Sequence, residues 1–306
     1  MPAELIDGAA IARGIRERVA GAAADVTARG VKPGLTVILV GDNPASASYV
    51  RSKGVAAEAA GIDSTTVRLP ANTAQSDLLS YVDELNADAR VHGILVQMPL
   101  PEQIDPDSVI LRIDPAKDVD GFHPVNVGKL LIGQRDSFVP CTPAGILELL
   151  RASEVTTTGR ECVIVGRSNI VGKPMAALLM QDADDGNATV TVCHRHTRDL
   201  RAHVKRAEIL IVAAGRANLI TGDMIRPGAV VIDVGMNRVA DASASSGYRL
   251  VGDVEFETAR EVASLITPVP GGVGPMTIAM LLSNTVVSAR RFVEKVDATR
   301  GLAAHT

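Results

Sequence analysis

The chain has 306 residues, of which 46% are hydrophobic and 22% charged, so it has the composition of a globular protein and a length that favours two domains. Its 31 lysines and arginines nearly balance 35 acids, and a formal charge of −4 excludes a broad positive surface for nucleic acid or an anionic membrane. Three separated cysteines without a Cys-x-x-Cys pair argue against a disulfide framework and against a metal site, and favour the cytoplasm. Neither a signal peptide nor a membrane-spanning segment is predicted.

Helical and strand patterns alternate along the first hundred residues. Apolar residues recur at helical intervals in some segments, and short apolar runs bounded by turn residues indicate strands in others. Helices are expected over 8–29, 45–60 and 75–88, and strands within 31–43, 64–70 and 92–101. This alternation is typical of a parallel sheet with crossover helices.

A stretch rich in proline and glycine, residues 114–145, interrupts this alternation, and a second series follows. Four apolar runs predict consecutive parallel strands: ECVIVGRS (161–168), TVTVCHRHT (189–197), EILIVAAG (208–215) and AVVIDVGMN (229–237). Residues 241–247 are expected at the tip of a hairpin, and residues 275–296 carry the apolar stripe of a helix.

A glycine turn joins strand to helix in VIVGRSNIVGKPMAALL, residues 163–179. Glycines let backbone N–H groups approach a pyrophosphate at the positive end of a helix, so phosphates are expected here. The spacing of Gly166 and Gly172 matches neither G-x-G-x-x-G nor a P-loop, which would need serine or threonine at Pro174. Taken alone, the pattern also fits a purely structural turn.

The segment after the next strand favours NADP over NAD. NAD-selecting folds place an acid there to bind the ribose hydroxyl, but TVTVCHRHTR (189–198) contains none. The residues that follow the strand are basic, and with Arg167 they suit a 2′-phosphate: His194, Arg195, His196 and Arg198. A solvated surface is the alternative for the arginines, and capping or packing for the histidines. Small residues at 212–215 and 234–237 leave room along the same sheet edge for adenine and nicotinamide.

A sparse polar set marks the first half of the chain: Tyr49, Lys53, Gln97, Asp118 and Asp120. The spacing of Tyr49 and Lys53 puts both side chains on one face of a helix. A helix surface on which the lysine covers the tyrosine is an alternative. Short-chain dehydrogenases also carry Tyr-x-x-x-Lys, but there the pair follows the dinucleotide fold, whereas here it precedes that fold.

Six motifs, in this order, resemble the bifunctional methylenetetrahydrofolate dehydrogenase/cyclohydrolase family, in its bacterial, two-activity form. They are NPAS-x-x-YV-x-x-K (43–53), GILVQ-x-PLP (93–101), KDVDGFHP (117–124), PCTP-x-G (140–145), VGRS-x-IVGKP (165–174) and TPVPGGVGPMT (267–277). The resemblance extends from roughly residue 5 to residue 292. It implies that NADP takes hydride from 5,10-methylenetetrahydrofolate and that water then opens the methenyl product to 10-formyltetrahydrofolate.

On the folate side, the resemblance implies Lys53 as the catalytic amine, with Gln97 hydrogen-bonded to it. It also implies that Tyr49 stacks on the folate and that Asp120 grips the pterin. Hydride transfer mainly requires positioning, but water addition and ring opening require proton transfer, for which an ordinary lysine is too firmly protonated. A cationic substrate and partial burial both favour loss of that proton. Asp118 is expected to serve the turn instead.

On the cofactor side, the resemblance implies phosphate contacts at Gly166, Arg167 and Ser168. Arg195 is implied near the 2′-phosphate and Met236 near the nicotinamide, with Gly215 at the same edge. Some relatives carry a small polar residue at position 195, and isoleucine is common at 236.

The glycine-rich segment PVPGGVGP (268–275), with Pro270 and Gly271, is expected to pass beside both ligands, because glycine backbone can approach closely. A turn that links the domains is the alternative.

The sequence therefore predicts a two-domain α/β enzyme with a folate cleft between its domains. Residues 1–140 and 276–306 form the folate domain with a parallel sheet, residues 141–275 a Rossmann-like NADP domain, and the C-terminal helix returns to the first domain. The family implies a homodimer, through the 236–254 hairpin or the helices of the nucleotide domain. A shikimate-type dehydrogenase explains Lys53 but not Gln97 with KDVDGFHP, and a binding protein without activity does not explain the intact polar set.

Overall fold

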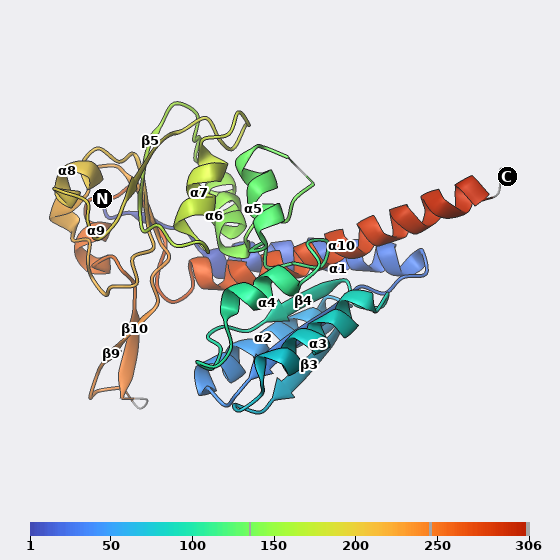
Figure 1. Cartoon of the computed structure of the whole chain (residues 1–306). Coiled ribbons are helices and arrows are strands. Elements are labelled where there is room, and N and C mark those ends of the chain that lie inside the picture. Colours follow the sequence, from blue (N-terminus) through green and yellow to red (C-terminus); the bar gives the residue numbers. More distant parts are fainter. Residues whose placement is uncertain (135, 245–246, 304–306) are drawn as a thin grey trace. The chain divides into compact units, whose positions relative to one another are not determined.

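The computed structural model describes residues 1–134, 136–244 and 247–303 (Figure 1). The chain divides into two compact units. One comprises residues 1–12, 130–135 and 142–277, and is called the nucleotide unit here; the other comprises residues 13–129, 136–141 and 278–306, and is called the lysine unit. The predicted two-domain α/β class, with a C-terminal helix that belongs with the first domain, is confirmed. No helix in the described ranges is long and apolar enough to cross a membrane.

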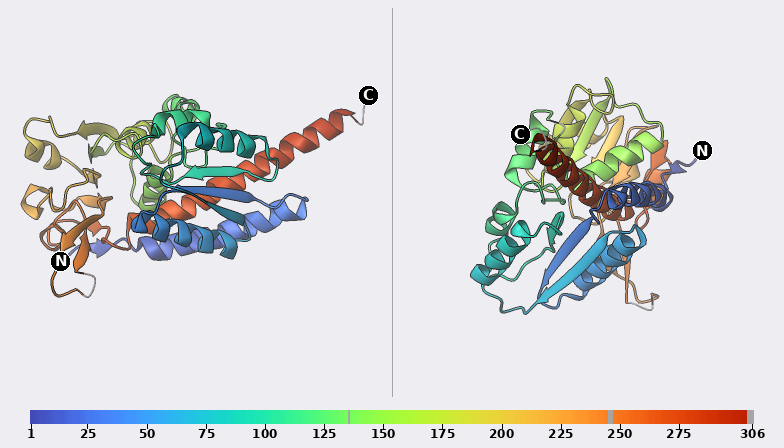
Figure 2. Two further views of the ribbon diagram at one scale, coloured as in Figure 1. Left: turned by 60° about the horizontal axis from the view of Figure 1, so that its bottom comes forward. Right: turned by 90° about the vertical axis from the view of Figure 1, so that its right-hand side faces the viewer.

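The lysine unit contains a three-stranded parallel sheet in the order β3-β2-β4. Its strands and helices, with bounds, are α1 (Gly8–Ala28), β2 (Gly34–Val40), α2 (Pro44–Ala59), β3 (Asp63–Leu69), α3 (Gln75–Ala87), β4 (Gly93–Val96), α4 (Pro106–Arg112), α5 (Pro124–Leu131) and α10 (Val273–Ala303). Residues 8–12 of α1, 130–131 of α5 and 273–277 of α10 belong to the nucleotide unit. Figure 2 shows α3 and α4 on one face of this sheet and α2 on the other. The central strand β2 is buried along its whole length, as expected for a strand covered on both faces.

The nucleotide unit contains a six-stranded parallel sheet in the order β1-β11-β8-β7-β5-β6. Its elements are β1 (Glu4–Leu5), α6 (Cys141–Ala152), β5 (Glu161–Val165), α7 (Gly172–Leu179), β6 (Thr189–Cys193), α8 (Leu200–Val204), β7 (Ile209–Val212), η1 (Gly222–Met224), β8 (Val230–Asp233), β9 (Asn237–Ala240), β10 (Tyr248–Val251), α9 (Phe256–Arg260) and β11 (Leu265–Ile266). Valine and isoleucine side chains on the strands pack into a continuous core between sheet and helices.

Strand order determines where a ligand can enter this sheet. From β5 the chain passes to β6 on one side and then to β7 on the other, so the order reverses beside β5. In doubly wound sheets, ligands bind at the carboxyl ends of the strands at such a reversal. The turns after β5 and β7 flank this position.

Two features differ from the expected elements, and a third agrees with them. The stretch 114–145 contains α5 and the start of α6, and α4 precedes it; these helices are short or begin in proline-rich sequence, which hides the helical period. The two-residue β1 pairs with β11, so residues 1–12 group with the nucleotide unit, whereas the sequence placed them in the first domain. The hairpin prediction holds, since β9 and β10 are antiparallel, although residues 245 and 246 of its tip lie outside the described part.

Candidate active site and cofactor-binding edge

Lys53 and Gln97 meet in the lysine unit. Lys53 lies on α2, one helical turn after Tyr49, and Gln97 directly follows β4. The Lys53 Nζ donates to Gln97 Oε1 at 3.0 Å, and Gln97 Nε2 donates to the carbonyl of Met98 at 2.8 Å. Because the Met98 carbonyl holds the amide nitrogen, the amide oxygen faces the lysine. Tyr49 is 40% exposed, which leaves surface for a flat ligand.

Asp120 belongs to the electrostatic environment of this amine. Burial raises the pKa of Asp120, while the positive charge of Lys53 lowers it and the charge of Asp118 raises it. The thiol of Cys141 is buried next to Asp120, and burial raises the pKa of Cys141 well above its usual value. The structure therefore brings Lys53, Gln97 and Asp120 together, as the sequence predicted, while their roles stay predictions.

Asp118 differs from Asp120, because its carboxylate is occupied by its own turn. It accepts hydrogen bonds from the backbone N–H groups of Gly121 at 3.1 Å and His123 at 2.8 Å. Asn126 Nδ2 donates to the same carboxylate at 2.8 Å. These bonds agree with the expected turn role of Asp118, which leaves Asp120 as the acid next to the lysine.

The predicted phosphate turn follows β5 in the nucleotide unit. Gly166 has φ +135°, and a Cβ there would lie 2.2 Å from the carbonyl oxygen of Ala213. Only glycine fits this crowded position with this backbone conformation. Ser168 Oγ accepts from the backbone N–H of Val171 at 3.1 Å at the entrance to α7, and the side chain of Arg167 is exposed. The turn thus has the backbone shape and the exposed donors that fit a pyrophosphate.

The basic residues after β6 lie beside this turn. Val165 pairs with Cys193, and the N–H of Gly166 donates to the carbonyl of Cys193 at 2.9 Å. Arg195 is exposed, and its Nε donates to His196 Nε2 at 3.1 Å. The backbone N–H of His196 donates to His194 Nδ1 at 3.2 Å, so the two histidines shape the loop. Arg195 is therefore near the turn, with an exposed guanidinium that fits a 2′-phosphate.

Gly215 and Met236 follow β7 and β8 at the same edge. Gly215 has φ +66°, and Met236 is 43% exposed with its Cε near Gly274. Pro270 and Gly271 lie in the loop before α10, where Gly271 has φ +107° and the N–H of Gly272 donates to Pro268 at 2.9 Å.

Two buried acids at this edge were missed by sequence reasoning. Asp253, which follows β10, accepts the backbone N–H groups of residues 214–216, and Asp233 at the end of β8 accepts three more. Burial raises the pKa of Asp233 to about 7, and its backbone hydrogen bonds oppose this shift. A signal was present in the sequence: glycine precedes Asp253 in VGDV, but a lone Gly-Asp pair suggests only a turn.

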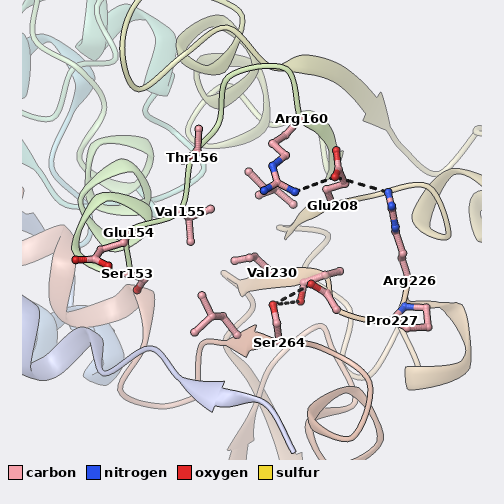
Figure 3. Close-up of a pocket in the computed structure, with 14 residues that line it drawn as sticks. Ser153, Glu154, Val155, Thr156, Arg160, Glu208, Arg226, Pro227, Val230 and Ser264 are labelled. Carbon is pink, nitrogen blue, oxygen red and sulfur yellow. Dashed lines mark hydrogen bonds and ion pairs between the residues drawn. The ribbon is translucent and has the colours of Figure 1, made fainter. Parts of the chain in front are cut away.

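A separate cavity opens at the opposite, amino edge of the six-stranded sheet (Figure 3). Its lining includes Arg160, Glu208 and Arg226; Arg160 donates to Glu208 at 2.9 Å, and Arg226 Nη1 lies 3.9 Å from the same oxygen. Because nucleotides bind at the carboxyl edge of such sheets, this cavity is not assigned to the cofactor. Within the described ranges, no group of three His, Cys, Asp or Glu side chains is arranged to hold a metal ion.

Comparison with known proteins places the chain in a family. Residues 6–120 match the tetrahydrofolate dehydrogenase/cyclohydrolase catalytic domain, and residues 140–293 match the NAD(P)-binding domain of the same family. The bifunctional protein FolD 1 of Myxococcus xanthus is 55% identical over an alignment that covers 94% of this chain and 98% of the relative. The bifunctional protein FolD of Bacillus subtilis is 54% identical over 95% of this chain and 99% of the relative.

Solved structures agree. The Campylobacter jejuni bifunctional enzyme FolD matches with a TM-score of 0.89 and 49% identity, over 94% of this chain and 99% of that one. The Trypanosoma brucei methylenetetrahydrofolate dehydrogenase-cyclohydrolase, solved with NADP and an inhibitor, matches with a TM-score of 0.89 and 44% identity, over 95% and 98%.

The chain belongs to the tetrahydrofolate dehydrogenase/cyclohydrolase family. It is an NADP-dependent 5,10-methylenetetrahydrofolate dehydrogenase and a 5,10-methenyltetrahydrofolate cyclohydrolase, an enzyme of one-carbon metabolism. The predicted family, reaction, enzyme class and cofactor are confirmed, and the shikimate-type and inactive alternatives are set aside.

Proposed function

We propose that Lys53 is the amine that moves protons during hydrolysis of the methenyl substrate. The hydrogen bond from its Nζ to Gln97 Oε1, 3.0 Å long, is the observation that carries this proposal. It holds the amine in one orientation and adds no second carboxylate beside Asp120, because the partner is an amide. A cationic methenyl substrate next to the amine favours its neutral form, in which it acts as a base.

Asp120 and Tyr49 bind the folate in this scheme. A carboxylate accepts hydrogen bonds from the amino and ring N–H groups of a pterin, which gives both orientation and selectivity. Burial works against the ionised form of Asp120, and Lys53 works in its favour, so the pair is coupled. The exposed ring of Tyr49 offers a stacking surface one turn away from Lys53 on the same helix.

The cofactor edge is made of Gly166, Arg167 and Ser168 around the phosphates, Arg195 at the 2′-phosphate, and Gly215 and Met236 toward the nicotinamide. When bound, NADP supplies the acceptor for a hydride from the one-carbon bridge. The chain's own residues bind and orient it, and Pro270 with Gly271 bring backbone close to the ligands.

Four further assignments belong to the proposal. The folate domain comprises residues 1–140 and 276–306, of which residues 1–12 group with the nucleotide unit, and the NADP domain comprises residues 141–275. The enzyme acts as a homodimer in the cytoplasm and has no nucleic-acid partner. The near balance of acids and bases in the sequence supports the last assignment.

One assay tests the catalytic part. Purified protein is mixed with NADP⁺ and 5,10-methylenetetrahydrofolate, and absorbance is followed for NADPH and the methenyl product. Turnover with a later loss of the methenyl signal is expected. Binding without turnover would contradict the catalytic roles, and turnover with shikimate in place of folate would contradict the substrate.

A further inference from the structure

Asp253 is a buried carboxylate that the reaction scheme above does not use. It is completely buried, and its carboxylate accepts four hydrogen bonds. Its Oδ2 accepts from the backbone N–H groups of Ala214 at 2.6 Å and Gly215 at 2.8 Å. Its Oδ1 accepts from the N–H of Arg216 at 2.8 Å and from Asn237 Nδ2 at 2.8 Å. Four donors match the four acceptor positions of one carboxylate.

The four donors come from two segments at the carboxyl edge of the sheet. Residues 213–216 follow β7, and residues 235–237 follow β8. These segments contain Gly215 and Met236, the proposed neighbours of the cofactor. Asp253 therefore joins two otherwise separate loops at the place where the nicotinamide half of the cofactor is expected.

Asp253 is itself held in place by Asp233. Its backbone N–H donates to Asp233 Oδ1 at 2.9 Å, and the N–H of Val254 donates to Asp233 Oδ2 at 2.9 Å. Two glycines make room for these carboxylates. A Cβ at Gly235 would lie 2.4 Å from Asp253 Oδ1, and one at Gly252 would lie 1.7 Å from Asp233 Oδ2.

We propose that Asp253 is a positioning residue for cofactor binding, which holds residues 213–216 and 235–237 in the shape that receives NADP. Because the N–H groups of 214–216 are used internally, they are not available to cofactor phosphates, which depend on the Gly166 turn instead. This inference rests on the proposed cofactor roles of Gly215 and Met236.

Asp253→Asn tests the inference with nearly the same side-chain shape. An amide offers one oxygen where the carboxylate offers two, so its NH₂ group opposes two of the four donors. We expect the Kd for NADP⁺ to rise about tenfold or more, from the loss of one or two buried hydrogen bonds. Hydrolysis of the methenyl substrate without cofactor is expected to stay within about twofold, because it depends on the lysine unit.

Two measurements do not depend on turnover. Calorimetric titration gives the NADP⁺ affinity, and hydrogen exchange of the cofactor-free protein reports the 213–218 amides, which are expected to exchange faster in Asp253→Asn. Asn237→Ala removes only the link to the second segment, so a smaller loss of affinity is expected. Asp184→Asn, an exposed acid of the same unit, is the control and should change neither quantity.

Unchanged NADP⁺ affinity in both Asp253→Asn and Asn237→Ala would overturn the inference, and so would an equal loss of hydrolysis, which would indicate a general structural role. Gly166→Ala distinguishes an error in the role of Asp253 from an error in the proposed cofactor-binding edge. If Gly166→Ala loses NADP⁺ binding and Asp253→Asn keeps it, only the role of Asp253 is wrong. If Gly166→Ala also keeps full affinity, the proposed cofactor edge is wrong as well.

Discussion

The amine of Lys53 donates a hydrogen bond of 3.0 Å to the side-chain oxygen of Gln97, whose amide nitrogen is held by the carbonyl of Met98. The two residues are 44 positions apart in the sequence, one on α2 and the other directly after β4, so the fold of the lysine unit brings them together. An amide in this position orients the amine without adding a second carboxylate beside Asp120.

Lys53→Met is expected to abolish hydrolysis of the methenyl substrate and to impair dehydrogenase turnover severely, while NADP binding stays intact. Loss of a proton-transferring group lowers the rate by roughly 100-fold or more. The loss of methenyl absorbance measures hydrolysis, and calorimetry measures NADP⁺ affinity. Lys32→Met removes an exposed lysine of the same unit and is the control. Unchanged hydrolysis in Lys53→Met would refute the role given to this amine.

Gln97→Glu is expected to slow hydrolysis at neutral pH by about tenfold or more, since a carboxylate stabilises the ammonium form of Lys53. The rate should recover as the pH rises. Gln97→Ala removes orientation without adding a charge, so its rate falls but its pH dependence keeps the wild-type position. Rate profiles between pH 6 and 10 distinguish the two variants, and identical profiles would contradict the electrostatic explanation.

Arg195→Ser is expected to weaken selection of NADP over NAD by roughly 10- to 100-fold, the value of one charge-assisted hydrogen bond to a phosphate. The measured quantity is the ratio of kcat/KM with the two cofactors. Affinity for NAD should change little, because NAD lacks the 2′-phosphate. Arg206→Ala, another exposed arginine of the nucleotide unit, serves as the matched control. An unchanged ratio would show that Arg195 does not contact the 2′-phosphate, and Arg167 would be the next candidate.

Protonation of His92 is expected to lower the free energy of unfolding in mild acid. His92 is 3% exposed, and its Nδ1 accepts the backbone N–H of Gly34 at 3.0 Å. Burial lowers the pKa of His92, and the charge of Lys117 lowers it further. The stabilisation is therefore present above the unfolded-state pKa near 6.5 and is lost as the pH falls through the folded-state pKa.

His92→Asn places an amide oxygen near the position of Nδ1 and removes the titration. Urea unfolding of both proteins at pH 7.5 and 5.5 measures the effect. The wild type is expected to lose more stability between these values than His92→Asn does. An equal loss in both proteins would show that other groups cause the acid sensitivity.

The three cysteines are expected to be unreactive in the folded enzyme. All three are buried, and burial raises the pKa of Cys162 to about 12 and also raises that of Cys193. The thiolate is the reactive form, so a disulfide reagent at pH 8 should titrate no thiol in the native protein and three in urea. Rapid titration of the native protein would show that at least one of these thiols is accessible and would contradict the prediction.

The strands, the glycine turn and the helical face of Tyr49 and Lys53 are predictable from the sequence, because each depends on a pattern of neighbouring residues. Strands such as β2 and β7 are short apolar runs, and their period and turn residues are visible along the chain. The glycine turn at 166 was predicted for the same reason: a backbone position that excludes a Cβ demands glycine. The spacing of Tyr49 and Lys53 was also sufficient to put them on one helical face.

Tertiary structure alone decided which distant groups meet. The pairing of β1 with β11 places Glu4 and Leu5 beside Leu265 and Ile266, near the other end of the sequence. Strands of two residues are too short to leave a periodic pattern in the sequence. The Asp253 carboxylate collects donors from residues up to 39 positions away, and its partners are mostly backbone N–H groups, which every residue except proline possesses. The sequence determines which side chains are present. Only the folded backbone determines which N–H groups point at them, because backbone N–H groups look alike in the sequence.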